Sequence, residues 1–92
     1  HPRIVRLNGQ PVEIVPEGIL FMMTNKDKPG IVGHLGTVLG KHDVNIANMS
    51  LERDREGGQA LTALNIDSVP SADCLAELEA DPDIINIRIV QF

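Results

Sequence analysis

Aromatic side chains are scarce in this sequence. Tryptophan and tyrosine are absent, and Phe21 and Phe92 are the two phenylalanines among 92 residues. Proteins that bind single-stranded nucleic acids stack bases on aromatic rings, and cages for quaternary ammonium groups are built from the same rings. The formal net charge is −5, whereas a nucleic-acid surface is basic. The composition therefore argues against nucleic acid as a partner.

Cysteine and long hydrophobic runs are also scarce. Cys74 is the single cysteine, so no disulfide can form within the chain, as is typical of the reducing cytoplasm. No apolar run approaches the ~20 residues that a membrane-spanning helix requires. We therefore predict a cytoplasmic protein with no membrane partner. The first residues are His1-Pro2-Arg3 without an initiating methionine, and we expect a fragment of a longer protein.

The remaining composition, with 42% hydrophobic residues, is that of one globular domain with a modest core. Residues 1–18 contain two β-like runs around Asn8-Gly9, a pair that favours a tight hairpin. Pro16-Glu17-Gly18 then interrupts the chain. We predict that 1–18 is a hairpin and linker forming the tail of a preceding domain, and that 19–92 is the main domain.

Residues 19–92 alternate between strand and helix patterns. We predict strands at 19–24, 44–54, 59–67 and 84–92, one helix after Pro29-Gly30, and a second helix capped by Ser71. The order β-α-β-β-α-β, with right-handed crossovers, gives a ferredoxin-like α+β fold. Its four-stranded antiparallel sheet carries both helices on one face. Alternating polar residues indicate that one face of this sheet is covered, although the uniformly apolar 19–24 suits burial on one or both faces.

Side-chain periodicity predicts which residues share a face of each element. These sets are Ile31, Leu35, Val38, Leu39 and His42 on the apolar face of the first helix, Cys74, Leu75 and Leu78 on the inward face of the second, Ala47, Met49 and Leu51 on one side of strand 44–54, and Ile85, Ile87 and Ile89 on one side of strand 84–92. In the usual strand order, strand 44–54 lies at an edge of the sheet. Its outer residues are polar but do not repel strongly, so we expect that it can pair with a second copy.

Catalytic and metal-binding patterns are not found in the sequence. His42 lies at a helix end, where histidine commonly satisfies the terminal carbonyl groups, and Cys74 has the position of a buried structural thiol. The histidines lack the spacing of a metal site, and no triad or carboxylate pair is evident. The glycines from Gly30 to Gly40 match neither a dinucleotide-binding motif nor a Walker loop. We predict no catalytic residue and no metal.

Gly33, Gly36 and Gly40 lie roughly opposite the apolar face of the first helix. Each glycine costs about 0.5–1 kcal/mol of helix stability relative to alanine. One explanation is a helix stabilised by tertiary packing that tolerates poor propensity. The other is close packing of a second subunit or domain on this outer face. The sequence leaves both open.

The loop that precedes this helix, Asn25 to Pro29, has the residues of a small-ligand site. A helix N-terminus offers free N–H groups and the positive end of a dipole, which suit a carboxylate. Asp27 could accept an ammonium group, so the loop could bind an amino acid zwitterion. Asparagine and aspartate are also ordinary turn and cap residues, and this simpler reading stays open.

The stretch DKPGIVGHLGTVLGKHDVNIANM resembles the ACT domain, a small regulatory module that binds amino acids in metabolic enzymes. The β-α-β-β-α-β order agrees with the fold of that family. The segment HPRIVRLNGQPVEIVPEG resembles the tail that precedes the ACT domain in the long forms of the D-3-phosphoglycerate dehydrogenase family. Iron–sulfur L-serine dehydratases carry a similar tail and ACT pair, and they are the alternative parent.

The resemblance implies a non-catalytic serine sensor in L-serine biosynthesis. ACT domains of the dehydrogenase family pair side by side as homo-oligomers and bind L-serine at the interface. Carried over here, one half of the site is Asn25, Asp27, Pro29, Gly30, Ile31 and Val32, and the other half is Asn45 of the second copy. The best-known pattern has His and Asn where this chain has Asn25 and Asp27. The implied parent enzyme uses NAD, and no cofactor is expected in this fragment. A structural dimerisation module without ligand is the alternative function.

Overall fold

The structure, a computed structural model, describes residues 3–7, 10–54 and 58–92. In chain order the elements are strands β1 (Arg3–Leu7), β2 (Gln10–Ile14) and β3 (Ile19–Lys26), helix α1 (Ile31–Lys41), strands β4 (Ile46–Asp54) and β5 (Gln59–Ile66), helix α2 (Ala72–Glu79) and strand β6 (Ile84–Gln91). The predicted elements after residue 18 are all found, with ends displaced by a few residues. The Asn8-Gly9 turn lies outside the described residues, but β1 and β2 pair antiparallel on either side of it.

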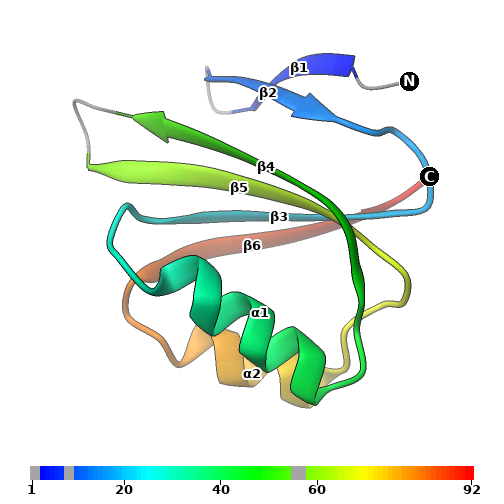
Figure 1. Ribbon diagram of the computed structural model, residues 1–92, viewed down its shortest axis with the longest axis vertical. Helices are drawn as coiled ribbons and strands as arrows, with labels where there is room; N and C mark the ends of the chain where they lie inside the picture. The colour runs from blue at the N-terminus through cyan, green and yellow to red at the C-terminus, as the bar shows by residue number, and fades with distance from the viewer. Residues whose placement is uncertain (1–2, 8–9, 55–57) are drawn as a thin grey trace.

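A four-stranded antiparallel sheet in the order β4-β5-β3-β6 forms the centre of the molecule. Both helices cover one face of this sheet, and the β1–β2 hairpin lies on the opposite side (Figure 1). The predicted ferredoxin-like α+β fold and the edge position of β4 are confirmed. The other edge is β6, which pairs with β3.

The main core lies between the sheet and the helices. Alternate residues of β3, Phe21 and Met23, are fully buried against the apolar stripe of α1 that includes Leu35 and Leu39. In α2, Cys74 and Leu78 complete the same cluster. The hydroxyl of Ser71 accepts a hydrogen bond of 3.1 Å from the backbone N–H of Cys74, which confirms the predicted N-cap.

A second, smaller core lies on the other face of the sheet. The hairpin contributes Val12 and Ile14, and the sheet contributes Leu20, Met22, Leu61 and Ala63. The sheet is therefore covered on both faces over β3 and β5, which explains why residues 19–24 are uniformly apolar. The chain after β2 is held by Asn65, whose amide donates to the carbonyl groups of Val15 at 2.8 Å and Glu17 at 3.3 Å.

Two of the predicted alternation patterns are wrong because each strand contains an irregularity. In β4 the pairing shifts between Ile46 and Asn48, so Ala47 is an extra residue and does not share a face with Met49. A second shift, opposite Asn25 in β3, leaves Ile84 buried in the core and Ile85 49% exposed. Periodicity from a single strand cannot show such a shift, because it depends on the partner strand.

Candidate functional site

The loop between β3 and α1 ends in an unusual helix start. Gly30 is the N-cap residue with φ 90°, a left-handed conformation that glycine adopts without strain, and it provides no side-chain cap. The first turn of α1 contains no acidic residue, whereas α2 is capped by Ser71 and has Asp73 in its first turn. The first N–H groups of a helix have no acceptor within the helix. In α1 the Ile31 N–H donates to the Lys28 carbonyl at 3.5 Å, so Val32 and Gly33 carry the N–H groups that can donate to an anion.

Asn25 was predicted to leave the strand on this loop, and this is wrong: it lies within β3 and is only 2% exposed. Its carbonyl oxygen accepts a hydrogen bond of 3.1 Å from the Thr62 hydroxyl, and its amide donates to the backbone carbonyl of Lys26 at 3.0 Å. Thr62 is itself fully buried. The side chain of Asn25 thus connects the end of β3 to β5, and both of its hydrogen-bond partners belong to the same chain.

Asp27 is the exposed acidic residue of the loop, and it is paired with Arg53 near the end of β4. The Arg53 Nε lies 3.0 Å from one carboxylate oxygen of Asp27 and 3.2 Å from the other. The backbone N–H of Asp27 donates to the carbonyl of Gly58 at 2.9 Å, which fixes the loop against the start of β5. The sequence interpretation missed Arg53. The sequence feature that could have indicated Arg53 is that it is the one cationic residue of the strand after the first helix.

Asn45 lies at the opposite end of β4. Its backbone N–H donates to Asp67 at 2.9 Å, and its side-chain amide donates to the other oxygen of that carboxylate at 3.1 Å. These bonds, that of the backbone first, hold the pKa of Asp67 below its usual value of 3.8. Arg53 lies eight positions after Asn45, about 26 Å along an extended strand. The chain therefore brings Asp27 and Arg53 together but does not bring Asn45 to them.

The other side of the loop is held by the turn after α2. The ammonium groups of Lys28 and Lys26 lie 3.3 Å and 3.8 Å from the same oxygen of Asp83. The backbone N–H of Lys26 also donates to the carbonyl of Asp83 at 2.8 Å. Pro29 and Gly30 thus lie between two sets of ion pairs that connect the loop to β4 and to the α2–β6 turn.

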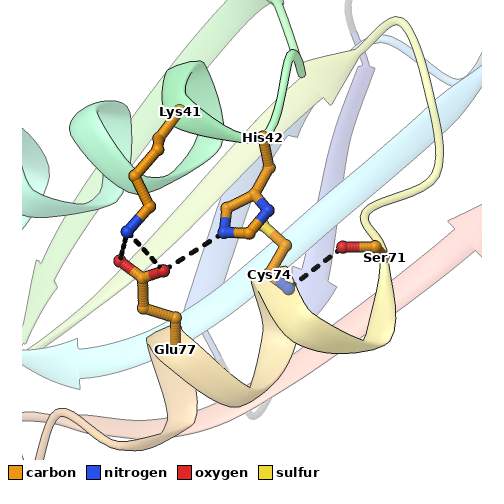
Figure 2. A network of polar contacts seen from close by, with 5 residues as sticks. All are labelled: Lys41, His42, Ser71, Cys74 and Glu77. Atoms are coloured by element: carbon orange, nitrogen blue, oxygen red, sulfur yellow. Dashed lines mark hydrogen bonds and ion pairs between the residues drawn. The ribbon is translucent and has the colours of Figure 1, made fainter.

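Figure 2 shows a polar cluster that joins the C-terminal end of α1 to α2. The Lys41 ammonium lies 2.8 Å from the Glu77 carboxylate, and the His42 Nε2 lies 3.1 Å from it. These two contacts, Lys41 first, hold the pKa of Glu77 below its usual value. Cys74 lies beside this cluster, but burial first and Glu77 second raise the pKa of its thiol. A nucleophilic cysteine is favoured by the opposite shift. The contacts of Lys41 and His42 with Glu77 join the two helices.

Residues 3–7, 10–54 and 58–92 contain neither a metal-binding cluster nor a membrane-spanning helix. In these ranges no three histidine, cysteine, aspartate or glutamate side chains are grouped closely enough to hold a metal ion. The same ranges contain no helix that is both long enough and apolar enough to span a bilayer.

The sequence pattern of the ACT domain matches residues 19–83, and the chain belongs to the ACT domain family. This is a regulatory domain, so the chain is not itself an enzyme. The membership supports a role in regulation by amino-acid binding.

Its relatives include several D-3-phosphoglycerate dehydrogenases. The chain is 34% identical over 88 residues to the enzyme of Bacillus subtilis (strain 168), which covers 96% of this chain and 17% of that protein. It is 34% identical over 91 residues to the enzyme of Archaeoglobus fulgidus, covering 97% of this chain and 17% of that protein. It is 29% identical over 89 residues to the enzyme of Methanocaldococcus jannaschii, covering 97% of this chain and 17% of that protein. The chain thus spans about a sixth of these relatives and corresponds to their C-terminal region.

Proposed function

We propose that this chain is the effector-binding domain of a cytoplasmic, NAD-dependent D-3-phosphoglycerate dehydrogenase and that it binds L-serine between two copies. The proposed boundaries are a linker hairpin at 1–18 and the ACT domain at 19–92. Asp27, Asn45 and the backbone from Pro29 to Val32 are the proposed contacts, with Asn25 as a support of the loop. Serine is the effector that the resemblance to the dehydrogenase family implies.

The observation that carries the proposal is the separation of Asp27 from Asn45. Asp27 is paired with Arg53 near the end of β4, whereas Asn45 lies just before its start, about 26 Å from Arg53 along an extended chain, so one small amino acid cannot touch both Asp27 and Asn45 within a chain. An antiparallel pairing of β4 with β4 of a second copy reverses one strand. Asn45 of the second copy then lies opposite Arg53 when the two-fold axis passes near Met49, since 49 is midway between 45 and 53. The same axis creates two equivalent sites.

The free edge of β4 supports such pairing. Residues 45–51 carry no charged side chain, and Ile46 and Met49 are 40% and 49% exposed. Edge strands that avoid pairing are usually protected by charges, prolines or a covering element. On α1, a methyl group added at Gly33, Gly36 or Gly40 would meet no atom within 4 Å. The outer surface of that helix is open to a second copy.

The chemistry of the loop suits an α-amino acid. The uncapped N-terminus of α1 presents backbone N–H groups and a partial positive charge to a carboxylate. The Asp27 carboxylate can accept the ammonium group. The amide of Asn45 both donates and accepts, so it can bind either end of the ligand from the second copy.

Binding across two copies couples the ligand to assembly. A ligand that contacts both copies favours the paired state by its differential affinity, and this coupling is reciprocal. β4 lies beside the linker, because Ala47 and Asn48 line the same shallow pocket as Val15, Glu17 and Gly18. A change at β4 can therefore reach the segment that leads toward the N-terminus.

The test is calorimetric titration of L-serine into the chain and into two variants. Asp27→Ala and Asn45→Ala should each weaken binding by about tenfold or more, because each removes a hydrogen bond to a charged group of the ligand. Asp73→Ala and Asn86→Ala are matched controls, since both residues are exposed and lie on α2 and β6. If the site variants bind L-serine as well as these controls do, the site is misplaced.

A mixing experiment tests the shared site directly. Neither Asp27→Ala nor Asn45→Ala retains an intact site alone. In a mixed pair, the loop of the Asn45→Ala copy faces Asn45 of the Asp27→Ala copy, which restores one site. Binding should therefore reappear when the two variants are mixed and exchanged. A mixture that binds no better than its components contradicts a site formed by two copies.

A structural pairing module without ligand is the second candidate. The observation in its favour is that Asp27 and Asn45 already have partners within the chain, namely Arg53 and Asp67. Sedimentation with and without L-serine separates the two functions. A sensor shows a ligand-dependent change in association, whereas a scaffold associates equally in both conditions and binds no amino acid.

A further inference from the structure

Asp27 is not an open receptor for a cation, because the guanidinium of Arg53 contacts both of its carboxylate oxygens at 3.0 and 3.2 Å. The carboxylate of Asp27 is one-third exposed and the Arg53 side chain is 65% exposed. A ligand ammonium can therefore approach Asp27, but it approaches a pair whose net charge is already zero.

The charges on the other side of this loop balance. Lys26 and Lys28 lie near the carboxylate of Asp83, and the Asp81 carboxylate accepts a hydrogen bond of 2.9 Å from the Asp83 backbone N–H in the same turn. The uncapped N-terminus of α1 adds a partial positive charge. The other oxygen of the Asp81 carboxylate lies 3.7 Å from Nε2 of His34 in α1.

We propose, on the basis of the amino-acid site described above, that Arg53 is its specificity-determining residue and makes the ligand carboxylate obligatory. A simple amine adds an uncompensated positive charge to a neutral ion pair beside the positive end of the α1 dipole, and it competes with Arg53 for Asp27. A zwitterion adds no net charge. Its ammonium joins Asp27 while its carboxylate compensates both Arg53 and the helix N-terminus. The class of ligand is thus an α-amino acid with a free carboxylate, and amines of the same shape are rejected.

The experiment compares L-serine with ethanolamine, which has the same ammonium and hydroxyl groups but no carboxylate. The 92-residue chain should bind L-serine at least about 100-fold more tightly than ethanolamine. Arg53→Gln should reduce this affinity ratio by about tenfold or more. It weakens the binding of L-serine, and it removes the cation that repels the ammonium group of ethanolamine. Arg53→Lys keeps the charge and should retain most of the ratio.

Lys41→Gln is the matched control, because it removes one positive charge from the far end of α1. It should leave the ratio unchanged. The affinity ratio does not respond to a loss of stability alone, since stability affects both ligands equally. If L-serine binds and the ratio in Arg53→Gln equals that of the unmodified chain, the Asp27–Arg53 pair is a surface ion pair only and this inference is refuted. If the unmodified chain binds neither L-serine nor any other α-amino acid, the proposed function itself fails, and the role of Arg53 with it.

Discussion

Replacing Thr62 with valine removes one hydroxyl group from the core beneath the loop while keeping the shape of the side chain. Thr62 lies opposite Met23 in the sheet and is fully buried, and its hydroxyl donates to Asn25 at 3.1 Å. The substitution leaves a buried carbonyl oxygen without this donor, which costs about 1–3 kcal/mol. The added methyl group returns about 0.8 kcal/mol through hydrophobic burial. We therefore expect the free energy of unfolding to fall by roughly 1 kcal/mol.

The assay is urea unfolding followed by circular dichroism, with the same substitution at Thr37 as the control. The hydroxyl of Thr37 also makes a hydrogen bond, to the carbonyl of Gly33 at 2.9 Å, but it is exposed to water. Thr37→Val should therefore change the stability by less than about 0.5 kcal/mol. In a domain of this size, a loss of 1 kcal/mol lowers the melting temperature by about 4–8 °C.

Whether Thr62→Val stabilises or destabilises a variant that lacks the Asn25 carbonyl shows whether the hydrogen bond is responsible for the effect. After Asn25→Leu there is no carbonyl oxygen to leave unpaired, and Thr62 itself becomes the buried polar group without its partner. In that background Thr62→Val should stabilise the protein, so the two substitutions should not be additive. The same destabilisation in both backgrounds would refute a role for the hydrogen bond between Asn25 and Thr62.

Two further predictions concern the helices. Lys41 and His42 favour the charged form of the Glu77 carboxylate, which lowers its pKa in the folded state. This carboxylate therefore stabilises the fold at pH values above its unfolded pKa near 4.5, and the stabilisation is lost as the pH falls through the lower folded pKa. Between neutral pH and pH values below 4.5, the urea midpoint of Glu77→Gln should fall less than that of the unmodified chain. An equal fall contradicts a stabilising role for the charged Glu77. Ser71→Ala removes the N-cap of α2 and should lower the free energy of unfolding by about 1 kcal/mol in thermal unfolding. The same change at exposed Ser68 should have little effect, and equal effects would show that the cap is not important.

The order of the elements could be predicted from the sequence because it depends on local patterns. The helix periodicity, the proline and glycine signals and the cap at Ser71 each act within a few residues of the chain. The strand at 19–24 carried further information, since its lack of polar residues fits burial by both the helices and the hairpin. What covers its second face is a long-range contact, and no local pattern names the partner.

The site was predicted less completely, and for a physical reason. The loop and its helix start are local features, so the position of Asp27 and the N-terminus of α1 could be expected. The contact of Arg53 with Asp27 depends on sheet register, in which Ala60 lies between Arg53 on one side and Asn25 on the other. The same long-range pairing decides that Asn25 is buried and that Ile84, not Ile85, lies in the core.

The hairpin on the helix-free face means that the residues matched by the ACT family pattern and the unit that folds are not the same. The family match begins at Ile19, whereas Leu20 and Met22 are buried beneath Val12 and Ile14 from the preceding segment, which the similarity to the dehydrogenases also covers. A chain shortened to begin at residue 19 would keep all the residues matched by the family pattern, but it would expose the apolar face of the sheet that the hairpin covers. Such a surface invites aggregation or foreign partners. Exchange of this domain between proteins is therefore expected to preserve the hairpin together with the residues that follow it.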